Sequence, residues 1–129
     1  MGHLSALLIA VAGVINLIPI VGVLSVSRLS ALYGIGIAGP DLEILMRHRA
    51  VVLGVTGVLL LVSAIRPGLR PVAAAVGLVS MLSFNAVAWT VGGYNDALSR
   101  VVTADWIGLA ALSAGMLVSF YEPRDRVAA

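Results

Sequence analysis

The sequence contains no cysteine and no lysine, and it has few charges of any kind. The lack of cysteine excludes disulfide bonds, thiolate catalysis and cysteine-ligated metals. The lack of lysine excludes Schiff-base chemistry and a phosphate-binding loop of the Walker type. Charged residues make up 11% of the 129 residues, whereas an average soluble chain carries about 25%. This composition argues against a soluble domain.

Hydrophobic residues, in contrast, make up 60% of the chain. They gather in four long stretches, at residues 4–26, 50–65, 72–91 and 106–121. A helix needs roughly 20 apolar residues to cross the hydrocarbon layer of a membrane, with 17–25 as the usual range. The first and third stretches meet this length alone. The second and fourth meet it only if their helices begin earlier, within the polar segments 41–49 and 96–105.

The sequence therefore predicts an all-α integral membrane protein, a four-helix bundle with antiparallel up-and-down topology. We expect a single transmembrane domain over residues 1–129, with spans at about 4–26, 44–65, 71–91 and 101–121. The first of these is expected to be a retained span rather than a cleaved signal peptide, because no Lys or Arg precedes it and its apolar run is long.

Turn-forming residues mark the connections between the spans. Segment 25–40 is the longest, and apolar residues at helical spacing within 28–34 predict a short helix at the membrane interface. Glycines then end that helix. Pro40 is expected at the start of the second span, and Asn95 is expected to cap the fourth.

Charged side chains are concentrated at one end of the predicted bundle. The opposite end shows only Arg66 and Arg70 in a tight turn and a short polar tail. If the protein has a functional site, we expect it to open towards the charged end. The residues proposed for a ligand-binding site or polar cluster are Glu43, Arg47, His48, Arg49, Asn85, Asp96, Arg100 and Asp105.

A stripe of small residues on the second span predicts the direction in which the Arg47 side chain points. Ala50 and the two glycines that follow it at helical spacing share one face, and small residues mark close packing between membrane helices. Arg47 lies on the same stripe, one turn outward. We expect Arg47 to point inward and to contact Asp105, with Glu43 as the competing partner.

Two interpretations of this charged end stay open. Asp96 precedes Arg100 by four residues, the spacing of an ion pair within a helix. In one interpretation the charges clamp the outer end of the bundle and reach the lipid headgroups. In the other they form a ligand-binding or catalytic site, because ionisable groups inside a membrane bundle are costly and mark function.

Two asparagines lie within the predicted spans. Asn16 precedes Pro19, which leaves one backbone carbonyl without its helical donor. The Asn16 amide is expected to serve that kink or a neighbouring helix. For Asn85, an interhelical hydrogen bond and the lining of a polar cavity are both open.

Aromatic residues and one histidine complete the polar end. Trp89, Tyr94 and Trp106 are typical of an aromatic belt at the membrane interface, and a stacking site for a ligand is the alternative. His48 lacks the converging ligands of a metal site, so we expect neither a metal nor a cofactor. Proton transfer between His48 and a nearby carboxylate stays open.

The chain resembles a group of small four-span bacterial membrane proteins, related in outline to the DoxX-like families. The resemblance covers most of the first half and rests on residues 16–19 (NLIP), 28–34 (RLSALYG) and 40–50 (PDLEILMRHRA). Some similar proteins carry the label phosphopantetheine adenylyltransferase, but the T/H-x-G-H motif of that enzyme is absent here. The resemblance implies the fold, singles out residues 47–49, and implies no activity.

These features lead to two hypotheses of function. The first is a small membrane protein that binds a lipid or apolar small molecule, or that serves as an accessory subunit. The second is a small intramembrane enzyme acting on a lipid or isoprenoid. We expect membrane lipid as a partner, with a small apolar ligand, a partner membrane protein and a homo-oligomer left open, and no nucleic acid. The expected location is the bacterial inner membrane, with both termini cytoplasmic.

Overall fold

The computed structural model describes residues 2–122, which are almost entirely helical and contain no strand. The long helices are connected by short turns and by two 3-10 segments. The elements in chain order are α1 (Gly2–Leu17), η1 (Ile18–Val23), α2 (Val26–Tyr33), α3 (Pro40–Ile65), η2 (Pro67–Leu69), α4 (Arg70–Val91) and α5 (Asp96–Tyr121).

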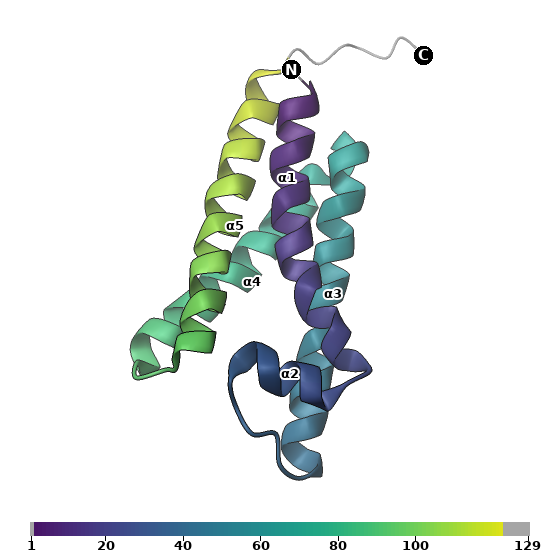
Figure 1. The fold of residues 1–129 in the computed structure, drawn as a ribbon. Helices are drawn as coiled ribbons and strands as arrows, with labels where there is room; N and C mark the ends of the chain where they lie inside the picture. The colour runs from purple at the N-terminus through teal and green to yellow at the C-terminus, as the bar shows by residue number, and fades with distance from the viewer. Residues whose placement is uncertain (1, 123–129) are drawn as a thin grey trace.

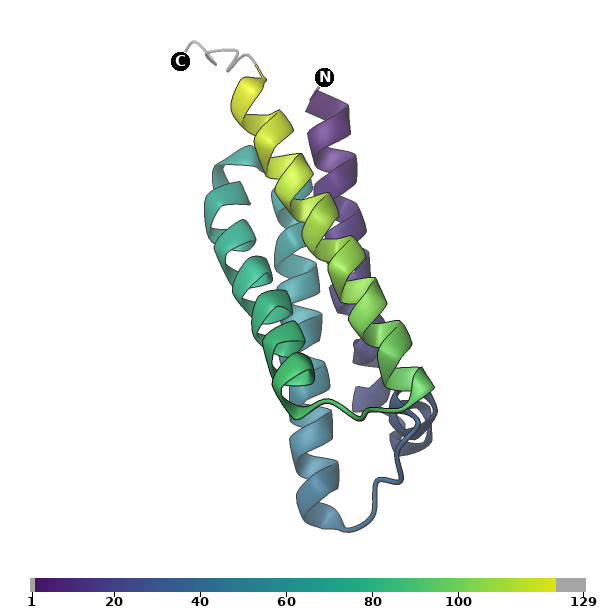
Figure 2. The same ribbon diagram turned by 90° about the vertical axis from the view of Figure 1, so that its left-hand side faces the viewer.

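The four long helices alternate in direction and form a bundle (Figures 1 and 2). Each packs against two neighbours, in the order α1, α3, α4, α5 and back to α1. The centre of the bundle is filled by apolar side chains from all four helices, among them Ile9, Leu60, Met81 and Leu112, each at most 1% exposed. The predicted all-α, up-and-down four-helix bundle is confirmed.

Four helical stretches are long and apolar enough to cross a membrane: Gly2–Val23, Pro40–Ile65, Pro67–Val91 and Asp96–Tyr121. The second and fourth begin within the polar segments, as their short apolar runs required. Pro40 occupies the first turn of α3, where its missing N–H costs nothing, and Asp41 and Glu43 follow in the same turn. The chain is compatible with a small multi-pass membrane protein.

The first span changes its helical form where the sequence places Pro19. α1 ends at Leu17, and the chain continues as the 3-10 helix η1. Asn16 is 3% exposed and donates a hydrogen bond from Nδ2 to the carbonyl oxygen of Ala12 at 3.0 Å. The Asn16 amide therefore bonds within its own helix, one turn before the proline.

α1 and α3 approach each other closely along the predicted stripe of small residues. A Cβ atom added to Gly57 would lie 2.8 Å from both the Gly13 oxygen and the Leu17 nitrogen. These are backbone atoms, which cannot move aside as a side chain can. Close approach of this kind supplies the packing attraction that the hydrophobic effect does not supply between helices in lipid.

α2 covers one end of the bundle. Its N-cap Ser25 accepts a hydrogen bond from the Arg28 N–H, and Gly34 ends it in the left-handed conformation (φ 64°). Asn95 caps α5 as predicted, and its Nδ2 also donates to the carbonyl oxygens of Tyr33 and Gly34 at 3.0 Å each. The predicted helix is present, but its apolar face packs on the protein rather than on the membrane interface, with Leu29 at 1% exposure.

The end of the bundle opposite α2 contains a buried polar network. From the sequence, this end showed only Arg66, Arg70 and a short polar tail. Arg70 is 6% exposed, and its Nη1 donates to the hydroxyls of Ser5 at 3.0 Å and Ser119 at 2.7 Å. Its other nitrogens donate to the carbonyl oxygens of Ala64 and Ser63. Arg70 thus joins α1, α3, α4 and α5.

The same network fixes the last described residue. The Glu122 carboxylate lies 3.5 Å from Arg70 and accepts a hydrogen bond from the Ser5 hydroxyl at 2.9 Å. The beginning of α1 and the end of α5 therefore lie side by side. The remaining arginines of the predicted tail, Arg124 and Arg126, are outside the described residues.

Candidate functional site

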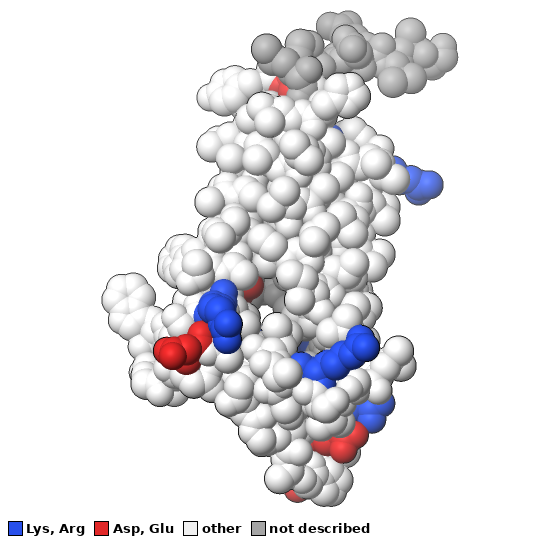
Figure 3. Space-filling view, viewed as in Figure 1, with Lys and Arg blue, Asp and Glu red and all other residues white. Residues whose placement is uncertain are grey.

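A large cavity lies at the end of the bundle that α2 covers. Its volume is about 1150 Å³, and it is lined by α1, η1, α2, α3, α4 and α5. Figure 3 shows the front face hollowed at this level, with part of an acidic residue visible inside, below a band of uncharged surface. The predicted direction of the site, towards the charged end, agrees with this position.

The walls of the cavity are mainly apolar. Val52 and Leu53 of α3 and Val76, Val79 and Phe84 of α4 form one side. Several of these side chains are accessible, including Val52 at 49% and Val79 at 68%. The cavity is therefore open rather than enclosed.

Arg49 is the central basic residue of the cavity. Its guanidinium carbon lies 5.0 Å from the centroid of the Tyr33 ring and 4.8 Å from that of Phe84. Such cation–π contacts hold the charge in place without using its N–H donors. Within residues 2–122, the Arg49 side chain makes no ion pair, and the Tyr33 phenol is the polar group that interacts with it. A guanidinium carries five N–H donors, so donors remain for a ligand.

Tyr33 forms the floor beneath this arginine and is 2% exposed. Burial raises the pKa of the Tyr33 phenol, because the charged phenolate loses its solvation, and the nearby Arg49 guanidinium lowers it by a smaller amount. The phenol is therefore neutral at physiological pH. It offers both a hydrogen-bond donor and an aromatic face.

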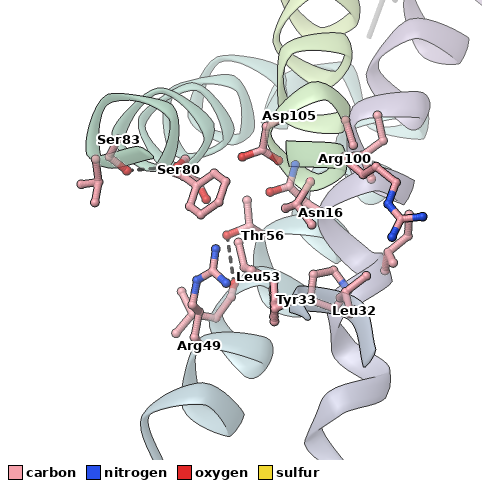
Figure 4. A pocket seen from close by; sticks show the side chains of 18 of the residues that line it. Asn16, Leu32, Tyr33, Arg49, Leu53, Thr56, Ser80, Ser83, Arg100 and Asp105 are labelled. Carbon is pink, nitrogen blue, oxygen red and sulfur yellow. Dashed lines mark hydrogen bonds between the residues drawn. The ribbon is translucent and has the colours of Figure 1, made fainter. Parts of the chain in front are cut away.

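Acidic and amide groups face Arg49 across the cavity (Figure 4). Asp105 of α5 and Asn16 of α1 point towards the space into which Arg49 and Thr56 extend from α3. Arg100 also lines the cavity, but its guanidinium points away from Arg49 and Asp105. Arg49 and Asp105 thus both point into open space and form no ion pair with each other. If these charges only clamped the end of the bundle, we would expect them to be paired.

The expected contact between Arg47 and Asp105 is wrong. Arg47 pairs with the competing partner, Glu43, at 2.9 Å, and its Nε donates to the Val23 carbonyl oxygen at 2.9 Å. Arg47 does lie above the small-residue stripe, but that stripe faces α1 and η1, whereas α5 packs mainly against α1 and α4, across the bundle from α3. Arg49, two residues further along, is the arginine that faces the cavity.

Other predicted site residues lie outside the cavity. His48 is exposed on α3. Asp96 lies in the first turn of α5 and does not pair with Arg100, since the ion pairs among residues 2–122 are Arg47–Glu43 and Arg70–Glu122.

Asn85 belongs to a separate and smaller cavity of about 380 Å³, between the end of α4 and α5. The predicted aromatic residues Trp89, Tyr94 and Trp106 line the same cavity. Asn85 thus lines a cavity, one of its two expected roles, and donates within its own helix to the Met81 carbonyl oxygen at 2.9 Å.

Sequence reasoning missed several polar residues of the large cavity and the whole Arg70 network. Tyr33, Thr56, Ser80 and Ser83 line the cavity. Isolated Ser and Thr residues are common in membrane helices, so none of them stood out. The hydroxyls around Arg70 could have been noticed, because Ser5 and Ser119 occur at the same level of two spans as the turn that contains Arg70.

No family model matches this chain, and neither a curated protein nor a solved structure matches it. The resemblance to the DoxX-like families therefore stays a prediction.

Proposed function

We propose that this protein is a small integral membrane protein that binds an amphiphilic molecule, a lipid or a lipid-like compound, in the large cavity. The observation that carries the proposal is the position of Arg49, which lies in an apolar cavity of about 1150 Å³ and forms no ion pair with the described residues. A charge is costly inside a membrane bundle, and a site for an anionic group gives it a partner.

The size and shape of the cavity support a ligand with an apolar chain. Pockets for small molecules measure about 300–1,000 Å³ and are mostly apolar with a few polar groups. This cavity reaches slightly beyond that range. Its accessible apolar walls, at Val52 and Val79, offer an apolar chain a surface to lie against.

The charges support an anionic head group. Arg49 and Arg100 line the cavity together with a single acidic residue, Asp105. A guanidinium presents its N–H groups in a planar fork that matches a carboxylate or a phosphate. Asp105, Asn16 and Tyr33 add hydrogen-bonding groups that would orient a head group carrying hydroxyls.

Native mass spectrometry of the detergent-purified protein tests this proposal, with wild type compared with Arg49→Ala and Arg47→Ala. We expect a co-purified lipid or small molecule on wild type and on Arg47→Ala, but not on Arg49→Ala. Arg47 is the matched control because it lies two residues away and is paired with Glu43. Equal occupancy of all three proteins, or none on any of them, would contradict binding at Arg49.

A second candidate function is an intramembrane enzyme that acts on a lipid or isoprenoid in the same cavity. The observation that favours it is the convergence of Asp105 and Arg49 on open space without an ion pair between them (Figure 4). A positioned carboxyl group can transfer protons to or from a bound substrate.

This second candidate is separated from the first by Asp105→Asn, which keeps the size of the side chain but removes its acid–base function. The purified proteins would be incubated with extracted membrane lipids, and the products would be followed by mass spectrometry. Conversion by wild type and not by the variant supports an enzyme. Retention of the same ligand by both proteins, with no new product, supports binding alone.

The proposed setting is the bacterial inner membrane, with both termini on the cytoplasmic side. The hydrogen bond between Ser5 and Glu122 supports a shared side for the two ends of the bundle. A role as an accessory subunit, or assembly with further copies, is compatible with the wide apolar outer surface.

A further inference from the structure

The large cavity has two sides of opposite chemical character. Arg49 of α3 supplies N–H donors and a positive charge on one side. Asp105 of α5 and Asn16 of α1 face it from the other side (Figure 4). Arg100 lines the cavity too, but its guanidinium points away from Asp105. The side formed by Asp105 and Asn16 is therefore the acceptor side of the cavity.

The oxygens of the acceptor side have no partner among residues 2–122. Asp105 forms no ion pair there, and Asn16 uses its Nδ2 to donate to the Ala12 carbonyl oxygen at 3.0 Å, which leaves Oδ1 unpaired. The Thr56 hydroxyl does not serve them either, because it donates to the Val52 carbonyl oxygen at 3.0 Å.

These oxygens are also within reach of a bound molecule. Among residues 2–122, the unpaired side-chain atoms that are fully enclosed by protein belong to Asn85 and Glu122. The unpaired oxygens of Asp105 and Asn16 are not among them, and both residues line the cavity. A ligand in the cavity therefore meets two accessible acceptors, one of them a carboxylate.

The charges decide which donor suits this side. An anionic group bound at Arg49 alone would leave Asp105 without a counter-charge and would place a second negative group in the same cavity. Uncompensated charge is costly inside a membrane bundle. A primary ammonium group carries a positive charge and three N–H donors, which match the Asp105 carboxylate and the Asn16 amide oxygen.

From these features we infer that the ligand of the large cavity is a zwitterionic amphiphile, with a phosphate that binds Arg49 and a primary ammonium that binds Asp105 and Asn16 Oδ1. This inference rests on the function proposed above and adds the class of the head group. A phosphoethanolamine head is a simple group that carries both charges.

A competition between two lipids tests the inference. Delipidated protein in an uncharged detergent at neutral pH would receive equal amounts of phosphatidylethanolamine and phosphatidylglycerol with the same acyl chains, and native mass spectrometry would measure what is bound. Phosphatidylglycerol keeps the phosphate but has hydroxyls in place of the ammonium. We expect wild type to favour phosphatidylethanolamine by about tenfold or more, the usual effect of a hydrogen bond to a charged group.

The outcomes separate this inference from the proposed function. Equal binding of the two lipids to wild type, with both lost in Arg49→Ala, would overturn the zwitterionic ligand and leave a lipid site at Arg49 standing. No binding of either lipid to wild type would overturn both proposals.

Asp105→Asn then tests the acceptor side, since it keeps the size of the side chain and removes its charge. Binding of phosphatidylethanolamine is expected to fall by about tenfold, and binding of phosphatidylglycerol is expected to stay equal or to rise. Asp96→Asn removes an exposed carboxylate of the same helix outside the cavity, so it is the matched control and should keep the preference of wild type. An unchanged preference in Asp105→Asn would overturn the inference.

Phosphatidylcholine provides a test that needs no variant. Its quaternary ammonium keeps the positive charge but has no N–H to donate. We expect it to bind wild type several-fold more weakly than phosphatidylethanolamine does. Equal binding of the two would overturn the hydrogen bonds to Asp105 and Asn16, and this result decides the question even if Asp105→Asn does not fold.

Discussion

The two ends of the bundle each contain a buried or partly buried arginine, and the two arginines are held in different ways. At the end where α1 begins and α5 finishes, Arg70 donates hydrogen bonds to two hydroxyls and two carbonyl oxygens and lies near the Glu122 carboxylate. At the α2 end, Arg49 lies between the Tyr33 and Phe84 rings beside a large cavity.

This difference separates a guanidinium that bonds to protein atoms from one that lies against aromatic rings beside open space. The guanidinium of Arg70 donates its N–H groups to protein atoms and so holds the surrounding helices together. The guanidinium that is held by aromatic faces, Arg49, is the one for which we propose a bound ligand. We call these two regions the closed end and the open end.

The largest effect is expected from Arg70→Ala. The substitution leaves the Glu122 carboxylate and two serine hydroxyls without their partner, and breaking a buried ion pair in this way costs about 3–5 kcal/mol. Unfolding in detergent, followed by circular dichroism, measures the loss. Arg66→Ala, an exposed change in the preceding turn, should stay within about 0.5 kcal/mol of wild type. Equal stabilities of the two variants would remove the distinction between the ends.

A matched pair of enlargements compares the packing of the two ends. Ala73 is 0% exposed in the apolar centre near the closed end, so Ala73→Phe is expected to destabilise the bundle by about 2–3 kcal/mol. Ala104 lines the large cavity, and Ala104→Phe has space to enter, so we expect little loss of stability.

The two enlargements, Ala73→Phe and Ala104→Phe, are expected to affect ligand binding in the opposite order to stability. Ala104→Phe fills part of the cavity and should lose the molecule detected by native mass spectrometry, whereas Ala73→Phe should retain it wherever the protein is folded. A strongly destabilised Ala104→Phe protein would mean that the cavity is tightly packed in solution.

A smaller effect is expected at the α1–α3 contact between the two ends. Gly57→Ala places a Cβ atom 2.8 Å from the Gly13 oxygen and the Leu17 nitrogen, which forces the helices apart at a cost of about 1–2 kcal/mol. Thermal unfolding monitors the change. Gly68→Ala, where the added atom meets nothing within 4 Å, is the control and should be neutral.

The smallest effect is expected from Glu43→Gln. The side chains of Glu43 and Arg47 are 39% and 44% exposed, and solvent screens their attraction. Loss of this pair within one helix should change the unfolding free energy by less than about 0.5 kcal/mol, and ligand retention should not change. A large effect on either quantity would mean that Arg47 contributes to the cavity after all.

Local features of the chain predicted the helices and their ends. Pro40 and Asn95 start their helices, Gly34 ends α2, and the 3-10 segment begins beside Pro19. Each of these outcomes depends on contacts within a few residues, so the residues themselves decide it. The close approach of α3 to another helix at Gly57 was also predictable, because small residues repeat on one face.

The choice among the arginines could not be predicted in this way. Arg47 and Arg49 are two residues apart and point to nearly opposite sides of α3. Periodicity identified the side that packs tightly, but the position of α5 around α3 depends on the tilt and order of all four helices. The sequence therefore predicted a charged end and assigned the wrong arginine to Asp105.

The sequence by itself determined four helices long and apolar enough to span a membrane, their approximate limits and the end at which polar groups gather. Only the tertiary structure decided which polar groups are satisfied. Ser5, Arg70 and Ser119 meet across 65 and 49 residues of chain, and the cavity collects side chains from all four spans and from α2. Helix formation is local, whereas hydrogen-bond saturation and empty space depend on how distant helices pack together.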